Sequence, residues 1–552
     1  MFKRILPCLL LSATLLSAAA CDSGDTAETT PAVSDDTAPA TVDYDFTDCK
    51  VIYSASANTD VTRYAERVRT QLRSATLQEI SLETDASEAA VKEILVGDTN
   101  RPESAEVKAK LPADAGHAYR IELVGDKFVI VATDDVALET AVQCFIYDVV
   151  KEIRDAKLPL ASDYCYADSY GSSTLLFSSG VQMKTQLVTT IYGPTDKQNV
   201  TNLSYGRIIE LAHNGAYNGV LLATSESLDV EKYLIHRSTD FGQTWEQVGA
   251  VTSQMKNLVA NWQPMLYELP CQVGDMAEGT ILLAGCVRNS DTTKTNMVIY
   301  KSTDFGSSWK LVSTVDSADG FSTTGGLSKG LWEPFLMCDD DGKLWCFYSD
   351  EKEAETHSQK LVCRYSTDGV SWSETQDVVA ADNQSLRPGM ITVTRLGDGR
   401  YLATYEIVGM SNNPIYFKIT DDLTDWNPSD IGEPVVTKRG EGFGSAPHCV
   451  WTPAGGKCGT LIVAAMFNYN ETDEKAADLL VSFDYGETWT AIENPLYYKT
   501  NVEARYAYSP GFFASADGKK IFYVNTVPAE AHPGKQDLKL AILEISEFGG
   551  IK

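Results

Sequence analysis

A short pattern of Ser-x-Asp followed by Gly and Trp recurs along the chain. Clear copies begin at Ser238, Ser302, Ser366 and Ser482 and read STDFGQTW, STDFGSSW, STDGVSW and SFDYGETW. A degenerate copy, TDDLTDW, begins at Thr420. The successive starts lie 64, 64, 54 and 62 residues apart, so one unit is about sixty residues long. This spacing, in a region of short alternating strands, predicts a repeat architecture.

Each copy has the composition of a tight turn between two strands. The Asp side chain can accept hydrogen bonds from N–H groups of its own turn, Gly supplies a permissive φ, and Trp packs under the next strand. The pattern resembles the Asp box of sialidase-like propellers. Units that bury their faces only against neighbours favour a closed ring, and residues 172–552 hold six such units. We therefore predict an all-β, six-bladed, sialidase-like propeller, closed by pairing a strand near Leu175 with LKLAILEI near the end.

Residues 44–171 are predicted to form a small α/β domain ahead of the propeller. CKVIYSA and EILVGDT have the character of strands, and YRIELVGDKFVIVATD that of a hairpin turning at Gly125-Asp126. The stretches 62–73 and 137–153 have helical spacing. The order resembles the N-terminal accessory domain of several carbohydrate-active enzymes, which implies a scaffolding role.

The N-terminal segment has the pattern of an export signal. Lys3 and Arg4 precede an apolar stretch, and small residues precede Cys21. This order resembles a bacterial lipoprotein signal over residues 1–20 with Cys21 as the lipidated residue; the alternative is a plain signal cleaved near Ala20. Residues 21–43 are polar and rich in Pro and Thr, as expected of a disordered tether. We expect an exported protein, lipid-anchored at the bacterial cell surface or the periplasmic face of a membrane.

Composition excludes several classes of function. The net charge is −30, from 76 acidic and 46 basic residues, and no Lys/Arg cluster interrupts it, which argues against a nucleic-acid partner. The cysteines after Cys21 show no CxxC spacing, and the six histidines are far apart, so neither a metal nor another cofactor is expected.

Aligning the units on their turns collects polar residues at one end of the predicted ring. The first strand of each unit opens with a polar residue beside Pro or Gly: Arg207, Gln263, Glu333, Arg387, His448 and Tyr508. The second strand returns to the same face, and its end carries Glu226, Arg288, Asp350, Glu351, Glu406, Asn468 and Asn525. Because the innermost strands of a propeller line its axis, these groups predict a central polar pocket.

Two of these acids have the character of a glycosidase pair. Glycoside hydrolysis needs one carboxyl group kept protonated by its surroundings and a second that is ionised. Glu333, between Trp332 and Pro334, suits the general acid/base, and Glu406, in the next unit, suits the nucleophile.

The residues around these acids resemble a known family. LWEPFL, FYSDE, RPGMITVTRLGDGRYLATYE and the earlier SYGRIIEL are similar to the exo-α-1,5-L-arabinanases, retaining enzymes on a six-bladed sialidase-like propeller. The resemblance spans most of 200–530 and implies that Glu333 and Glu406 are the catalytic glutamates and that the substrate is a carbohydrate. The predicted substrate-binding residues are Arg207, Gln263, Arg288, Trp332, Glu351, Arg387, His448, Arg505 and Tyr508.

Two other functions stay open at this point. Arg207, Arg387 and Arg505 come from three units, as does the three-arginine clamp with which sialidases hold a substrate carboxylate, and Tyr506 or Tyr508 offers a tyrosine nucleophile. The propeller also has the features of a non-catalytic glycan-binding surface protein, whose charged mouth only holds sugar.

Overall fold

The structure is a computed structural model of the chain. It describes residues 41–111, 117–170, 174–177, 180–194, 203–227, 229–291, 293–319, 329–437, 440–468, 477–496, 508–529, 531–532 and 534–547. The predicted signal, Cys21 and nearly all of the predicted tether lie outside these residues. Of the helices that are described, none combines the length and apolar composition needed to cross a membrane.

Residues 50–170 contain a mixed six-stranded sheet in the order β3-β2-β4-β6-β5-β8. Apolar residues of α1 and α3 pack on one face of this sheet, and Val107 of α2 packs on the other with Ile52, Leu95 and Val129. The strands are β2 (Lys50–Tyr53), β3 (Ser81–Thr84), β4 (Glu93–Val96), β5 (His117–Val124), β6 (Lys127–Ala132) and β8 (Cys165–Tyr170), with β1 (Thr41–Asp45) paired to β7 (Lys157–Ala161).

The predicted helices are present and longer or more complex than expected. The helix expected over 62–73 is α1 (Thr59–Thr76), which begins earlier because the Asn58 side chain accepts a hydrogen bond from the N–H of Val61 and caps it. The stretch 137–153 is divided into α3 (Asp135–Cys144), a π-helical turn (Phe145–Val149) and a 3₁₀ turn (Val150–Glu152). The short helix α2 (Pro102–Lys108) was not predicted. The domain boundaries 44–171 and 172–552 stay predictions.

The described residues from 174 onward form a six-bladed β-propeller, as predicted. Blades one to four are each a four-stranded antiparallel sheet in chain order. Their strands are β11 (Leu203–Glu210), β12 (Leu221–Ser227), β13 (Tyr233–Ser238) and β14 (Glu246–Val251); β15 (Val259–Glu268), β16 (Ile281–Arg288), β17 (Lys294–Ser302) and β18 (Lys310–Asp319); β19 (Leu331–Cys338), β20 (Leu344–Asp350), β21 (Lys360–Ser366) and β22 (Gln376–Val379); and β23 (Arg387–Arg395), β24 (Tyr401–Val408), β25 (Ile415–Thr420) and β26 (Glu433–Pro434).

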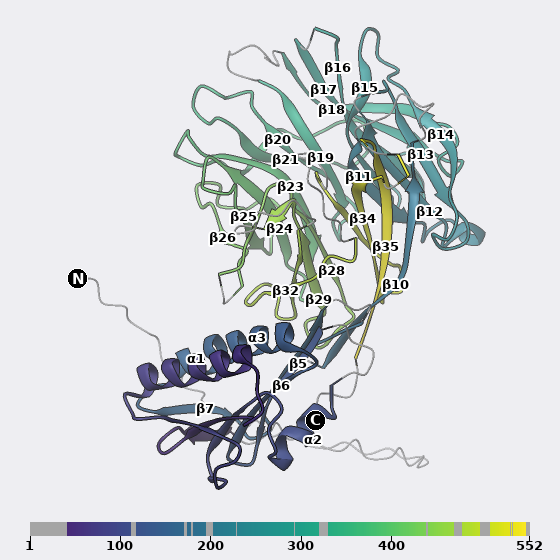
Figure 1. The fold of residues 1–552 in the computed structure, drawn as a ribbon. Helices are drawn as coiled ribbons and strands as arrows, with labels where there is room; N and C mark the ends of the chain where they lie inside the picture. The colour runs from purple at the N-terminus through teal and green to yellow at the C-terminus, as the bar shows by residue number, and fades with distance from the viewer. Residues whose placement is uncertain are drawn as a thin grey trace, which may run out of the picture. The chain divides into compact units, whose positions relative to one another are not determined.

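The fifth blade carries a small extra ribbon, and the sixth closes the ring. Blade five is β28 (His448–Thr452), β29 (Thr460–Ala464), β31 (Leu479–Ser482) and β32 (Thr490–Ile492), and β27 (Phe443–Gly444) pairs separately with β30 (Phe467–Asn468). Blade six joins β33 (Gly511–Ala514), β34 (Lys520–Pro528) and β35 (Gln536–Glu547) to β10 (Val181–Tyr192) and β9 (Thr174–Leu176). Figure 1 shows yellow β35 beside blue β10, so the predicted closure is confirmed.

The repeated pattern forms the turn between the third and fourth strands of a blade. In the second blade, Asp304 Oδ1 accepts hydrogen bonds from Ser308 N and from Ser302 Oγ, both at 2.8 Å. The indole N–H of Trp309 donates to the carbonyl of Gly306 at 2.9 Å. The bonds from Oδ1 to the Ser hydroxyl and to a backbone N–H of the turn recur in blades one, three and five, around Asp240, Asp368 and Asp484.

Candidate active site

A residue with left-handed backbone conformation lies within, or just before, the innermost strand of every blade. The six residues are Tyr205, Gln263, Glu333, Met390, Ala446 and Ser509, with φ of 50°, 54°, 58°, 59°, 51° and 58°. None of them is glycine, and residues that carry a side chain rarely adopt a positive φ. The surrounding structure must therefore hold the backbone in this conformation. In the first four blades the pairing register to the second strand shifts at this point, as in a β-bulge. We call these six residues the mouth ring.

Glu333 belongs to the mouth ring and is held by three side chains. Its Oε2 accepts a hydrogen bond from Ser349 Oγ at 2.7 Å. Its Oε1 accepts from the Tyr205 hydroxyl and from Gln263 Nε2, both at 3.3 Å. The backbone N–H of Glu333 donates back to Gln263 Oε1 at 3.1 Å, so the Gln263 amide binds both the main chain and the carboxyl group of this residue.

The electrostatic environment favours a protonated Glu333. Burial raises the pKa of its carboxyl group to about 7 from an ordinary value of 4.5, and the nearby carboxylates of Glu406 and Glu351 act in the same direction. The hydrogen bond from Ser349 and the charge of Arg387 oppose this shift. A carboxyl group with such a pKa can donate a proton near neutral pH, as a general acid must.

Glu406 lies near the end of β24 in the adjacent blade and is 4% exposed. Its Oε2 accepts hydrogen bonds from Ser445 Oγ at 2.6 Å and from the backbone N–H of Ala446 at 2.9 Å. No described residue donates a hydrogen bond to its other oxygen, Oε1, so that one oxygen is fixed and the second is available to a substrate. Opposite Glu406 in the register lies Gly389, where a side chain would come within 2.8 Å of Gln359 Nε2.

The two carboxyl groups share one mouth. Glu333 and Glu406 act on each other electrostatically, and both act on the Tyr508 hydroxyl. Met390, next to Gly389, donates its backbone N–H to Ser349 Oγ at 3.2 Å, the same hydroxyl that binds Glu333. Both acids therefore lie at the same end of the ring.

Arg387 and Glu351 form an ion pair in this region. The guanidinium Nη2 and Nε lie 2.8 and 3.2 Å from Glu351 Oε1. Glu351 is buried, and its Oε2 accepts a hydrogen bond from Gly330 N at 3.2 Å. Arg387 also interacts electrostatically with Glu333 and Glu406, so its charge partly offsets the carboxylates of the mouth.

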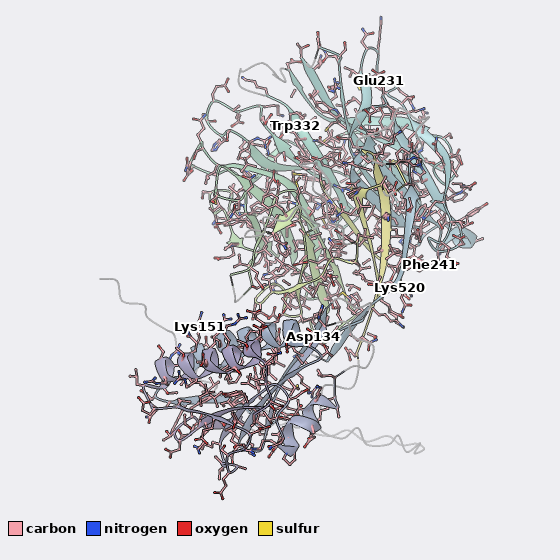
Figure 2. All side chains as sticks on the ribbon, in the orientation of Figure 1. Asp134, Lys151, Glu231, Phe241, Trp332 and Lys520 are labelled. Carbon is pink, nitrogen blue, oxygen red and sulfur yellow. The ribbon has the colours of Figure 1, made fainter. Side chains whose placement is uncertain are left out.

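An aromatic stack adjoins Glu333. The rings of Trp262 and Trp332 are stacked with centroids 5.5 Å apart and planes 21° apart, and the Arg288 guanidinium lies 4.3 Å from the centroid of Trp262. Figure 2 labels Trp332 among the propeller strands, where it immediately precedes Glu333 in β19. Arg288 and Trp332, both predicted to bind substrate, thus belong to one stack.

Two predicted mouth residues lie elsewhere. Arg207 and His448 line a cavity of about 300 Å³ bounded by the innermost strands of all six blades, together with Met265, Phe335 and Phe512. The Arg207 guanidinium donates to the Ser509 hydroxyl at 2.8 Å and to backbone carbonyls, and burial lowers its pKa to about 10. The prediction of both residues at the mouth is wrong. Each follows the mouth-ring residue of its own blade by two positions, so its side chain lies deeper along the innermost strand, in the cavity.

The remaining predicted residues have mixed outcomes. Tyr508 packs edge-on against Tyr205 with ring centroids 5.6 Å apart. Arg505 and Tyr506 lie outside the described residues.

Three residues that contact the glutamates were not predicted from the sequence. They are Tyr205 and Ser349, which bind Glu333, and Ser445, which binds Glu406. The segments SYGR and YSDE contain the first two, but only the fold shows these contacts. Within the described residues, no group of three or more His, Cys, Asp or Glu side chains is arranged to hold a metal ion.

Comparisons with known proteins show which solved structures this chain resembles. No protein-family model and no curated protein matches the chain. Among solved structures, the GH93 α-L-arabinofuranosidase of Fusarium graminearum, solved with arabinobiose, aligns with a TM-score of 0.56 and 27% identity over 65% of this chain and 98% of that one. The α-L-arabinanase of Penicillium chrysogenum, also with arabinobiose, gives a TM-score of 0.55 and 28% identity over the same shares. The chain is therefore a glycoside hydrolase on a sialidase-like six-bladed propeller, similar to the arabinofuranosidases and arabinanases of this group.

Proposed function

We propose that the protein is a retaining exo-glycosidase that removes terminal α-L-arabinofuranosyl residues from arabinan. The observation that carries this proposal is the pair of glutamates at one mouth, on adjacent blades and in unlike surroundings. The substrate class is supported by the similarity to two structures solved with arabinobiose. The exo mode of action rests on the resemblance of the WEP, YSDE and RPGM segments to exo-arabinanases.

The two glutamates have separate roles in this reaction. Glu333 donates its proton to the leaving oxygen while Glu406 Oε1 attacks the anomeric carbon and forms a covalent glycosyl–enzyme ester. Water then attacks the same carbon as Glu333, now ionised, removes its proton, and the sugar leaves with its original configuration. The carboxyl groups of a retaining pair lie about 5–5.5 Å apart, and we expect this separation in a crystal structure with a bound sugar.

The described contacts disfavour a sialidase. A carboxylate clamp needs guanidinium groups that converge on one empty spot. Arg387 is instead paired with Glu351, and Arg207, which lines the cavity, donates to the Ser509 hydroxyl. Burial also raises the pKa of Tyr508 well above its ordinary value, so its phenol stays protonated at neutral pH. A mouth lined by Glu333, Glu351 and Glu406 suits a neutral sugar better than an anionic one.

A substrate panel with product analysis tests the proposal. The protein without its first 21 residues is incubated with linear arabino-oligosaccharides, 4-nitrophenyl α-L-arabinofuranoside and sialyl glycosides. Release of arabinose from the non-reducing end is expected, and ¹H NMR of the first-formed sugar should show the α configuration. Hydrolysis of sialyl glycosides alone, or a β-configured first product, would contradict the substrate class or the retaining mechanism respectively.

We also propose that the enzyme is exported and anchored through a lipid on Cys21, and that residues 44–171 act as an accessory scaffold. The signal-like pattern before Cys21 supports the first statement, and the separate sheet and core of residues 50–170 support the second. Metabolic labelling with a fatty acid should mark the wild-type chain and leave Cys21→Ala unlabelled.

A further inference from the structure

A further buried carboxyl group lies near Glu333 and has no role in the reaction described above. Glu226 lies near the end of β12, the second strand of the first blade, and is 6% exposed. Its Oε1 accepts a hydrogen bond from Ser204 Oγ at 3.2 Å. Its Oε2 accepts from the backbone N–H of Gln263, in the second blade, at 2.6 Å.

The bond to Gln263 is one case of a repeated connection between neighbouring blades. A side chain near the end of a second strand accepts the N–H of the mouth-ring residue in the following blade. Glu226 accepts from Gln263, Ser349 accepts from Met390, and Glu406 accepts from Ala446. Glu226 is therefore the counterpart of Glu406 in the first blade, and both acids also accept a bond from a serine hydroxyl.

Gln263 transmits this contact to the general acid. Its φ of 54° places a non-glycine residue in the left-handed region, a conformation that needs support from its surroundings. The short bond to Glu226 supplies such support at the N–H of that residue. The side-chain amide of Gln263 then binds Glu333 twice, through Nε2 to the carboxyl oxygen and through Oε1 to the backbone N–H.

Glu226 and Glu333 are coupled electrostatically as well as through their contacts with Gln263. Burial raises the pKa of Glu226 to about 7, and Glu333 contributes to that rise. The other titratable or charged groups that act on Glu226 or feel its charge are Tyr205, Arg207, Tyr233, Cys286 and Arg288. The charged groups that act on Glu333 are Glu351 of its own blade and Arg387 and Glu406 of the fourth blade, and Tyr508 feels the charge of Glu333.

We propose that Glu226 is a positioning residue for the reaction: through the backbone and side chain of Gln263 it fixes the carboxyl group of Glu333. This inference rests on the proposed function, because it assigns Glu333 as the proton donor. In this assignment Glu226 acts on the reaction through Gln263 and not by contact with the sugar.

The test compares Glu226→Gln with a matched control. Gln keeps an oxygen for the Gln263 N–H and removes the charge. Glu268→Gln is the control, because Glu268 is also buried and accepts the N–H groups of Ala212 and His213, at the opposite end of β15. The first measurement is the ¹³C NMR titration of the Glu333 carboxyl group, assigned by its loss in Glu333→Gln, which needs no substrate. Glu226→Gln should lower the apparent pKa of Glu333 by roughly 0.5–1 unit, and Glu268→Gln should leave it unchanged.

The second measurement is the pH dependence of kcat/KM. In Glu226→Gln the alkaline limb should move to lower pH by the same amount, and kcat should fall by about tenfold with little change in KM. If Glu226→Gln matches Glu268→Gln in both measurements, the inference is wrong. If the wild type cleaves none of the tested sugars, the proposed function fails, and the titration still decides whether Glu226 acts on Glu333.

A variant of the intermediary residue covers the case in which Glu226→Gln does not fold. Gln263→Met keeps the backbone N–H that binds Glu226 and removes the amide that binds Glu333. Because the Gln263 amide stabilises the ionised carboxylate, the pKa of Glu333 should rise in this variant while kcat falls. An unchanged pKa and an unchanged kcat would contradict the proposed connection.

Discussion

The environment of Glu333 bears both on the proposed reaction and on the stability of the fold. Its side chain is partly buried among Tyr205, Gln263 and Ser349, so ionisation is disfavoured in the folded protein and easy in the unfolded chain. As a proton donor it must be protonated in the free enzyme. We expect kcat/KM to fall as the pH rises above about 7, with the limb absent from Glu333→Gln. An alkaline limit unaffected by this substitution would mean that another group donates the proton.

The same shift makes a prediction for stability. The folded pKa of Glu333 lies above its unfolded value, so its stabilising contribution is full below about pH 4.5 and is lost as the pH rises towards 7. Glu333→Gln should therefore gain Tm relative to the wild type as the pH is raised from 4 to 8. Thermal unfolding of both proteins across this range checks the sign; a difference that is constant with pH would argue against a buried, protonated Glu333.

The roles proposed for the two glutamates predict that substitution of each will depend differently on the leaving group of the substrate. Glu406→Gln should lower kcat by at least about 10²-fold on every substrate, because no covalent intermediate can form. Glu333→Gln should lower kcat by about 10²–10⁴-fold on arabino-oligosaccharides and much less on 4-nitrophenyl α-L-arabinofuranoside, whose phenolate leaves without a proton. Steady-state kinetics on both substrates make the comparison. Equal losses on both substrates for both variants would remove the distinction between acid and nucleophile.

At the scale of the strand, the left-handed residue of each innermost strand decides which side chains reach the mouth. When the units are aligned on the Pro or Gly near the start of their first strands, Arg207, Gln263, Glu333 and His448 occupy equivalent positions. Regular strand alternation would therefore place their side chains at the same depth along the axis of the propeller. The left-handed residue of each blade is instead Tyr205, Gln263, Glu333 or Ala446, so Arg207 and His448 fall one layer further along. A positive φ at a non-glycine residue leaves no mark in sequence. For this reason the sequence could predict the glutamate pair but not the layer of its neighbours.

The repeated turns are expected to stabilise the blades and to take no part in the reaction. Asp304 accepts bonds from Ser302 and Ser308 and holds the turn between β17 and β18. Asp304→Ala should lower the free energy of unfolding by about 1–2 kcal/mol, because turn groups lose their acceptor, and should leave kcat/KM unchanged. Chemical denaturation and kinetics on the same sample test both halves. A change in kcat/KM without a loss of stability would contradict a purely structural turn.

At the scale of the whole molecule, closure of the ring depends on residues more than three hundred positions apart. β35 pairs on one side with β34 and on the other with β10. The regular spacing of the turns and the apolar LKLAILEI segment were enough to predict six blades and this closure, because periodicity and strand alternation survive in sequence. A chain ending before β35, at residue 535, should therefore fail to fold, whereas one ending at Glu547 should fold. Circular dichroism with a thermal melt distinguishes the two; a cooperative melt of the shorter chain would contradict the role of this strand.

The central claim is that Glu406 is the nucleophile and Glu333 the acid/base of a retaining glycosidase, and azide rescue tests it most directly. In Glu406→Ala, azide can attack the aryl α-L-arabinofuranoside only from the vacated face, in one displacement, so the glycosyl azide should have the inverted, β configuration. In Glu333→Ala the covalent intermediate still forms and azide replaces water, so the glycosyl azide should be α. The reverse pair of configurations would exchange the two roles, and hydrolysis at wild-type rates in either variant would contradict the account.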